Sequence, residues 1–286
     1  MSDLARFLAR LEPLLPLPQE VDWTARAFRW RRRAYLGGER GHLEAVKRLA
    51  RIAPEDLQHV EAQREAILRN TEQFVRGLAA NNVLLTGARG TGKSSLVRAC
   101  LERFGAQGLR LIEVDKRDLV DLPDITALLD DRPERFILFC DDLSFEEGEA
   151  GYKALKAALD GSLAAAGDNV LIYATSNRRH LMPEYMQENL AAKYQADGEI
   201  HPGETVEEKI SLSERFGVWL SFYPFRQDDY LDIVAHWLAH FAVAAARAAW
   251  QAEALQFALQ RGSRSGRVAV QFARDYAGRH GLSSAR

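Results

Sequence analysis

The most informative part of this sequence is NNVLLTGARGTGKSSLV, residues 81–97. Residues 82–86 form a short apolar run that predicts a buried strand. GARGTGKS follows at positions 87–94 and fits the phosphate-loop pattern G-x-x-x-x-G-K-[ST]. Residues 94–104 then predict a helix. This order places backbone amides and a helix N-terminus around one anion, so the stretch predicts a phosphate-binding site.

The residue types within the loop match the chemistry of nucleotide binding. Its glycines let the backbone curl so that successive N–H groups face one anion. Lys93 is expected to reach the β- and γ-phosphates of a nucleotide, and the Ser94 hydroxyl is expected to ligate Mg²⁺. The predicted nucleotide contacts in the loop are Gly87, Ala88, Arg89, Gly90, Thr91, Gly92, Lys93, Ser94 and Ser95.

Four further apolar runs follow the loop and alternate with helical patterns. They cover residues 109–114, 136–141, 169–176 and 218–223. Continuous apolar strands separated by helices predict a parallel sheet that is covered on both faces. The expected fold is therefore an α/β P-loop core of three layers, α/β/α, around a five-stranded parallel sheet.

Two adjacent carboxylates end the run at residues 136–141. Ligands gather at the carboxyl ends of parallel strands, so Asp141 and Asp142 are expected beside the phosphate loop. Asp141 is the predicted Mg²⁺ partner, and Asp142 is predicted to polarise the attacking water. A strand that merely ends in turn residues would explain the pair equally well if no phosphate loop preceded it.

YATSNRRH, residues 173–180, extends this pattern to a known superfamily. Together with the loop and the Asp-Asp pair, it resembles the sensor-1 strand of AAA+ ATPases. The resemblance implies that Asn177 lies between the phosphate loop and Asp142, where its amide would orient the hydrolytic water or contact the γ-phosphate. A helix N-cap or turn role remains the alternative for Asn177.

Two later segments resemble bacterial replication initiators of the same superfamily. LSERFGVWLSFYP, residues 212–224, matches the region with an arginine finger, which implies that Arg215 acts on a nucleotide bound by a neighbouring subunit. SGRVAVQF, residues 265–272, matches the sensor-2 helix of the lid, which implies that Arg267 contacts the phosphates, with Arg264 as the other choice. Surface salt bridges are the alternative for both predicted arginines.

The segment that leads into the core, residues 56–74, resembles the AAA+ region beside adenine. Leu57, Val60 and Gln63 fit its L-x-x-V-x-x-Q pattern. His59 and Val60 match positions that line the base through backbone and apolar contacts. An ordinary amphipathic helix is the alternative explanation for these residues.

The stretches above, with CDDLSFEEG at positions 140–148, closely resemble an uncharacterised bacterial family of predicted AAA+-like ATPases. That resemblance spans about residues 53–277. Many AAA+ proteins have Glu at the position of Asp142. The shorter side chain argues against fast ATP hydrolysis, although the replication initiators share the Asp-Asp pair. The acidic segment at 181–210 is long for the superfamily, and it is either a partner or subunit contact or a solvated helix and loop.

Composition describes an ordinary globular chain, but its charge is unevenly distributed. The 286 residues include 47% hydrophobic residues and have a formal net charge of -2. Residues 1–52 have a net charge of +5, residues 53–225 of -10, and residues 226–286 of +3. These segments are the three predicted domains: a helical N-terminal segment, the nucleotide-binding core and a helical lid. The core charge disfavours nucleic-acid binding by the core itself.

The basic N-terminal segment is predicted as helices at residues 4–14, 22–35 and 42–52. Its central arginines could pack as a solvated helix face, bind nucleic acid with nearby aromatic residues, or dock on the acidic core of a neighbouring subunit. We favour the first interpretation. The arginines are Arg26, Arg29, Arg31, Arg32 and Arg33, and the aromatic residues are Trp23, Phe28, Trp30 and Tyr35.

The sequence gives little support for a metal site, for another class of nucleotide enzyme, or for a location outside the cytoplasm. Two cysteines in apolar runs indicate reduced core thiols, and the apolar runs are too short to span a bilayer, so a cytoplasmic location is expected. His236 and His240 lack the H-E-x-x-H zinc pattern. No N-K-x-D guanine signature accompanies the phosphate loop, which disfavours a GTPase, and a monomeric kinase leaves the sensor-1 and finger motifs unexplained.

The sequence thus predicts an ATP-binding AAA+ protein that hydrolyses ATP slowly with Mg²⁺ at a subunit interface. ATP and ADP are the expected ligands, a homo-oligomer is expected at least transiently, and an unknown protein partner would be remodelled or loaded. Nucleic acid is a less favoured partner. The alternative is a nucleotide-gated interaction or scaffold protein in which hydrolysis is incidental.

Overall fold

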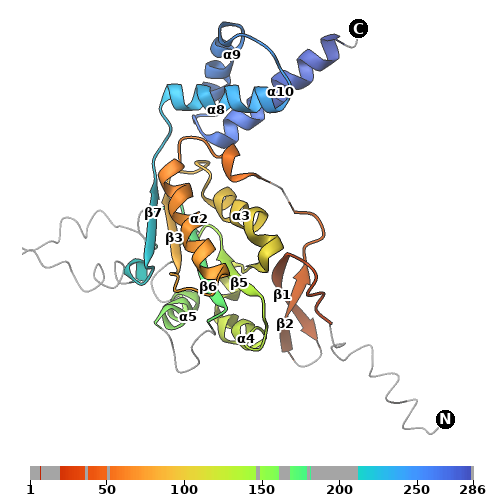
Figure 1. The fold of residues 1–286 in the computed structure, drawn as a ribbon, viewed down its shortest axis with the longest axis vertical. Helices are drawn as coiled ribbons and strands as arrows, with labels where there is room; N and C mark the ends of the chain where they lie inside the picture. The colour runs from red at the N-terminus through yellow and green to blue at the C-terminus, as the bar shows by residue number, and fades with distance from the viewer. Residues whose placement is uncertain are drawn as a thin grey trace, which may run out of the picture.

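A seven-stranded sheet forms the centre of the molecule. The computed structural model describes residue 7 and residues 20–35, 38–49, 52–145, 149–160, 168–178, 181 and 212–284. The strand order is β2-β1-β4-β5-β6-β3-β7 (Figure 1). The five strands predicted from the sequence are parallel: β3 (Val83–Gly87), β4 (Leu109–Glu113), β5 (Arg135–Cys140), β6 (Val170–Ser176) and β7 (Val218–Phe222).

Helices cover both faces of the sheet, which confirms the three-layer α/β/α core. Leu84 and Leu85 are both fully buried but belong to different apolar clusters, because successive strand residues face opposite sides. The cluster around Leu85 includes α2 (Glu61–Val75) and α3 (Lys93–Phe104). The cluster around Leu84 includes η4 (Lys116–Asp121), α4 (Leu122–Ala127) and α5 (Ala150–Leu159).

The helical prediction for the basic N-terminal segment is wrong over residues 22–35 and over the described residues 42–49 of the third predicted helix. β1 (Ala27–Tyr35) and β2 (Gly38–Ala45) form an antiparallel hairpin, and β1 extends the sheet in parallel with β4. Phe28 and Trp30 are buried, whereas Arg29 between them is exposed. Burial of one face of the hairpin in the apolar cluster of η4 and α4 thus imposes a two-residue period, and the two strands raise the strand count from five to seven.

Side-chain contacts fix the hairpin to its own core. The Trp30 indole donates a hydrogen bond of 2.8 Å to Asp121, and Arg32 donates two bonds, of 2.7 and 2.5 Å, to the same carboxylate. Arg29 donates to Glu113 at 2.8 Å. The basic segment therefore contacts acidic residues of its own chain, whereas the sequence also allowed docking on the acidic core of a neighbouring subunit.

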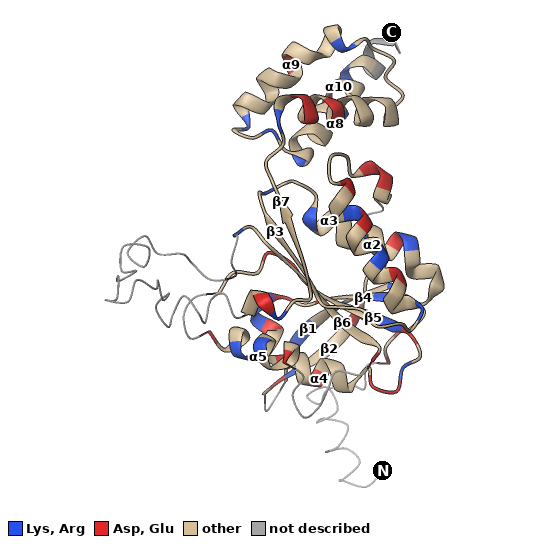
Figure 2. Ribbon diagram, turned by 60° about the vertical axis from the view of Figure 1, so that its left-hand side comes forward, with Lys and Arg blue, Asp and Glu red and all other residues tan. Residues whose placement is uncertain are grey.

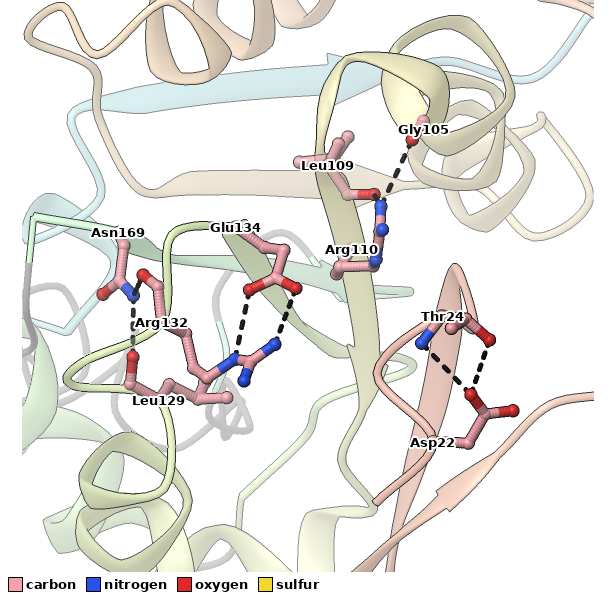
Figure 3. A network of polar contacts seen from close by, with 9 residues as sticks. All are labelled: Asp22, Thr24, Gly105, Leu109, Arg110, Leu129, Arg132, Glu134 and Asn169. Atoms are coloured by element: carbon pink, nitrogen blue, oxygen red, sulfur yellow. Dashed lines mark hydrogen bonds and ion pairs between the residues drawn. The ribbon is translucent and has the colours of Figure 1, made fainter.

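Polar contacts also hold the loops at the amino ends of the parallel strands (Figure 3). The Asn169 amide donates to the carbonyls of Leu129 and Arg132 at 2.8 and 3.1 Å. The Arg132 guanidinium bonds Glu134 and lies 4.3 Å from the centre of the Trp23 ring. These contacts therefore connect the loops at this end of the sheet to one another.

Three helices after β7 form the predicted lid: α8 (Gln227–His240), α9 (Arg247–Gln260) and α10 (Gly266–Ser284). α8 ends at His240, and Ala242 beyond it has a positive φ of 58°. Tyr230 is buried and donates a 3.0 Å bond to the Ala254 carbonyl, which joins α8 to α9.

Two predicted segments lie outside the described residues. Of the predicted helix at 4–14, only Phe7 is described, and it is helical. Of the acidic segment at 181–210, only Leu181 is described, and it is buried. The predicted domain boundaries at residues 52 and 225 remain predictions.

Candidate nucleotide site

The phosphate loop joins β3 to α3 through three glycines with positive φ. Gly87, Gly90 and Gly92 have φ angles of 120°, 73° and 102°. A Cβ at Gly87 would lie 2.0 Å from the carbonyl oxygen of Phe222, which also accepts a 3.1 Å bond from the Ala88 N–H. The loop conformation therefore depends on the absence of side chains at these positions.

Lys93 is buried at the start of α3 and points back into the loop. Its Nζ donates to the carbonyls of Gly87 and Ala88, both at 2.7 Å, and to Asn177 Oδ1 at 3.1 Å. Burial lowers the pKa of Lys93 from 10.5 to about 8, against the opposing effect of Asp142 and Asp141. A buried ammonium of this kind gains from an anion that enters the loop.

The two acidic residues after β5 lie beside the loop, because the parallel strands β5, β6 and β3 all end on the same side of the sheet. Asp141 Oδ1 accepts a 2.6 Å bond from the Ser94 hydroxyl and another 2.6 Å bond from Thr175. The predicted metal pair, Ser94 and Asp141, is thus in direct contact. The sequence analysis missed Thr175, although its place two residues before Asn177 at the end of β6 could have indicated it.

Asp142 and Asn177 also meet at this edge of the sheet. The Asn177 amide donates to Asp142 Oδ1, while its oxygen accepts from Lys93. Asp142 has a φ of 53°, and its N–H donates a 2.9 Å bond to Thr175 Oγ1. The structure therefore brings Lys93, Asn177 and Asp142 into one connected network.

A cleft of about 730 Å³ opens over this network between the core and the lid. Arg267 of α10 lines the cleft, whereas Arg264 is not among its lining residues. The Gly266 N–H donates a 2.9 Å bond to the Gly90 carbonyl, so the start of α10 rests on the phosphate loop. Of the two arginines considered for sensor 2, the structure places Arg267 at the site.

The apolar end of the cleft differs from the predicted adenine contacts. His59 and Val60 are not among its lining residues. His59 lies 3.5 Å from Asp229 and 3.4 Å from Asp232 of α8, whose acidic residues are visible in Figure 2. Val60 is buried. The residues that line this end are Ile52, Leu57, Gln58, Ile233 and Trp237.

Cationic side chains outnumber the carboxylates around the cleft. Besides Lys93, four arginines line it, and none of them has an ion pair among the described residues: Arg89, Arg98, Arg267 and Arg274. Asp56, the acidic residue at the apolar end, lies 3.0 Å from His236. Sequence analysis did not single out Arg98 and Arg274, because each lies on a helix face that only the tertiary structure turns toward the cleft.

Arg215 lies at the amino ends of the parallel strands, on the side of the sheet opposite the phosphate loop. It precedes β7, whose five residues span about 13 Å toward the phosphate loop. Arg215 pairs with Asp160 at the end of α5. The predicted arginine finger is therefore separate from the nucleotide cleft of its own chain.

These residues fit Mg²⁺ with a nucleoside triphosphate. The loop offers N–H groups and a buried lysine to phosphate, and Ser94 and Asp141 offer the oxygen ligands that Mg²⁺ prefers. Within the described ranges, no group of three or more His, Cys, Asp or Glu residues could hold a metal by itself. No helix of the described part is long and apolar enough to cross a bilayer.

Solved structures similar to this chain share its AAA+ fold. A variant of Thermotoga maritima RuvB matches with a TM-score of 0.53 at 18% identity, over 78% of this chain and 63% of that one. The Thermotoga maritima RuvB Holliday junction branch migration motor matches with a TM-score of 0.50 at 18% identity, over 75% and 59%. The chain thus spans about six-tenths of the RuvB chains that it matches.

The sequence comparisons define the family. No curated protein sequence matches the chain. A family model described as "Protein of unknown function (DUF815)" matches residues 23–280, which include the hairpin, the phosphate loop and most of the lid. The chain is therefore a member of the DUF815 family, with the α/β P-loop fold of AAA+ ATPases.

Proposed function

We propose that this protein binds ATP with Mg²⁺ in the cleft and hydrolyses it slowly. The observation that carries the proposal is the connected network at the carboxyl edge of the sheet. Lys93 contacts Asn177, Asn177 contacts Asp142, and Ser94 contacts Asp141, all beneath a cleft lined by cations. These groups are the ones that phosphoryl transfer to water requires.

Each residue has a distinct part in the proposed reaction. Lys93 and the loop N–H groups hold the phosphates, and Arg267 adds a positive charge from the lid. Ser94 and Asp141 would hold Mg²⁺, which neutralises charge on the phosphates. Asp142 accepts a proton from the attacking water, and Asn177 fixes the orientation of that carboxylate.

A pair of variants tests this assignment. Lys93→Ala removes the buried ammonium and should abolish ATP binding by titration calorimetry. Asp142→Asn should retain ATP binding, because it leaves the phosphate contacts intact, but lose turnover in a phosphate-release assay. Unchanged ATP affinity in the Lys93 variant would show that the cleft is not the nucleotide site.

We propose that Arg215 acts in an oligomer, on a nucleotide held by a neighbouring subunit. Its place at the amino ends of the parallel strands supports this role, because from there Arg215 cannot reach the cleft of its own chain. Arg215→Ala should lower turnover with little change in ATP affinity. An ATP-bound protein that stays monomeric, with activity per chain independent of concentration, would contradict the role in trans.

A nucleotide-gated interaction protein is the second candidate function. The observation that favours it concerns Asp142. Its carboxylate accepts a hydrogen bond from Asn177, and its side chain is shorter than that of the Glu found in many AAA+ proteins. In that case turnover would rise only when a partner binds and frees the carboxylate. The Asp142→Asn variant with ATP is the bait for identifying this partner, and the co-purifying material should be analysed for both protein and nucleic acid.

A further inference from the structure

The outer face of the β1–β2 hairpin carries a surplus of positive charge. Between Arg26 and Arg48 there are eight Arg or Lys residues and two Glu residues. The hairpin lies at one edge of the sheet beside α3 (Figure 1). Its apolar side chains are used to hold it to the core, since Phe28, Trp30 and Leu43 are buried. The charged side chains therefore define the surface that the hairpin presents to solvent.

Only some of these cations are neutralised within the chain. Arg32 lies 2.5 Å from Asp121 and 3.3 Å from Asp118, Arg29 pairs with Glu113, and Arg31 lies 3.5 Å from Glu44. Five others have no ion pair among the described residues. They are Arg26, Arg33, Arg40, Lys47 and Arg48.

The register of the hairpin places two of the unpaired arginines directly opposite each other. Arg33 is the cross-strand partner of Arg40, so both side chains leave the same face of the sheet. Arg31 and its partner His42 follow two residues away, about 6.7 Å along the strands. Like charges in direct cross-strand register repel each other, and a bound anion would relieve that repulsion.

A hollow of about 230 Å³ continues the basic surface toward α3. It is lined by Arg26, Arg29, Arg48 and Arg98, with Glu102 and Glu113. Arg98 also lines the nucleotide cleft. The unpaired cations thus extend from the hairpin to the helix that begins at the phosphate loop.

We propose that this face binds the sugar-phosphate backbone of a nucleic acid without regard to base sequence. A repeating row of guanidinium groups on an extended strand suits a repeating polyanion, whereas a single acidic side chain would occupy one position. Phe28 and Trp30 are buried, so they cannot stack on bases. The binding needs no nucleotide in the cleft and does not depend on the proposed ATPase activity.

The test measures fluorescence anisotropy of labelled 30-residue DNA, duplex and single-stranded, without ATP at several salt concentrations. Replacement of Arg33 and Arg40 by Ala should weaken binding roughly tenfold and reduce the slope of log affinity against log salt by about 2. Both side chains are exposed, so the variant should fold. Slow amide hydrogen exchange in β1 checks that the hairpin remains docked.

The matched control removes a neutralised ion pair outside the proposed surface. Arg76→Ala combined with Glu72→Ala removes a surface pair at the end of α2, leaves the net charge unchanged and should leave the salt slope unchanged. Equal losses in both double variants, or no binding to either DNA at 50 mM salt, would overturn the proposal. So would polyglutamate that binds as tightly and depends on the same arginines, because the surface would then fit an acidic protein.

Discussion

The centre of the sheet and its hairpin edge are stabilised in different ways. Val83, Leu84 and Leu85 of β3 are completely buried, and β3 pairs with strands on both sides. The hairpin buries one face only and depends on side-chain bonds to Asp121. Replacement of a glycine in the closely packed centre should therefore cost the most stability, whereas truncation of a side chain should detach the hairpin edge.

The largest expected effect comes from Gly87→Ala at the centre. Gly87 has a φ of 120°, and an added Cβ would lie 2.0 Å from a backbone oxygen of β7. We expect a loss of about 3 kcal/mol or more in the free energy of unfolding, with loss of ATP binding. Gly38→Ala in the hairpin is the matched control, because Gly38 has a φ of 141° with nothing within 4 Å.

The Gly38 variant should cost only about 1–2 kcal/mol, which is the backbone strain without the collision. Urea unfolding of both variants measures the difference. Equal costs would mean that strain alone, and not contact between β3 and β7, makes glycine necessary at position 87.

Trp30→Ala should be the most damaging change in the hairpin. Trp30 is buried, packs against Gly41 and bonds to Asp121, so truncation should cost about 3–5 kcal/mol. Amide hydrogen exchange should accelerate in β1 and β2 but remain slow in β3. ATP affinity should stay unchanged, and its loss would show that the two regions are not independent.

The protonation of Lys93 should make both stability and ATP binding depend on pH, with a smaller effect than the substitutions above. The folded pKa of Lys93 is about 8, below its ordinary 10.5, so the unfolded chain binds more protons between these values. The contribution of Lys93 to stability without nucleotide should therefore rise with pH across this window, measured as the stability of the protein minus that of the Lys93→Met variant. Thermal unfolding at several pH values measures it.

Bound phosphates favour the charged form of Lys93, so ATP binding above pH 8 takes up a proton. ATP affinity should fall by at most about tenfold per pH unit from pH 8 toward 10.5. Calorimetry in buffers with different ionisation enthalpies detects the proton. Binding that is flat with pH would mean that the phosphates do not contact this lysine.

The smallest effect comes from two carboxylates that lie beside Arg32. The bond from Arg32 lowers the pKa of Asp121, whereas burial raises the pKa of Asp118. Asp121→Asn should cost about 1–2 kcal/mol at neutral pH, and the Asp121 contribution should disappear as the pH falls below 3.8.

Asp118→Asn is the matched control and should be neutral or slightly stabilising at neutral pH, because its charged form is disfavoured. Urea unfolding at pH 7 and at about pH 3 compares the two variants. Similar losses in both would contradict the view that Asp121, and not Asp118, is the carboxylate that stabilises the hairpin.

The nucleotide edge of the core was predictable because its signals are local. The phosphate loop is eight contiguous residues, and Asp141, Asp142 and Asn177 each end an apolar strand. Parallel pairing brings strand ends together at one edge of a sheet, so these residues meet without further information. The motif therefore determined the α/β core and most of the network around Lys93.

Tertiary structure decided the rest, since it depends on partners far along the chain. Arg and Trp residues near the N-terminus fit a helix as well as a strand, and contacts with distant residues select the hairpin, among them Asp121, 91 residues after Trp30. Trp237 and Arg274 line the cleft because the lid folds back over the core. Sequence alone determined the chemistry of the phosphate loop, because it lies in contiguous residues. Only packing decided the hairpin and the apolar end of the cleft, because long-range burial and ion pairing outweigh local propensity there.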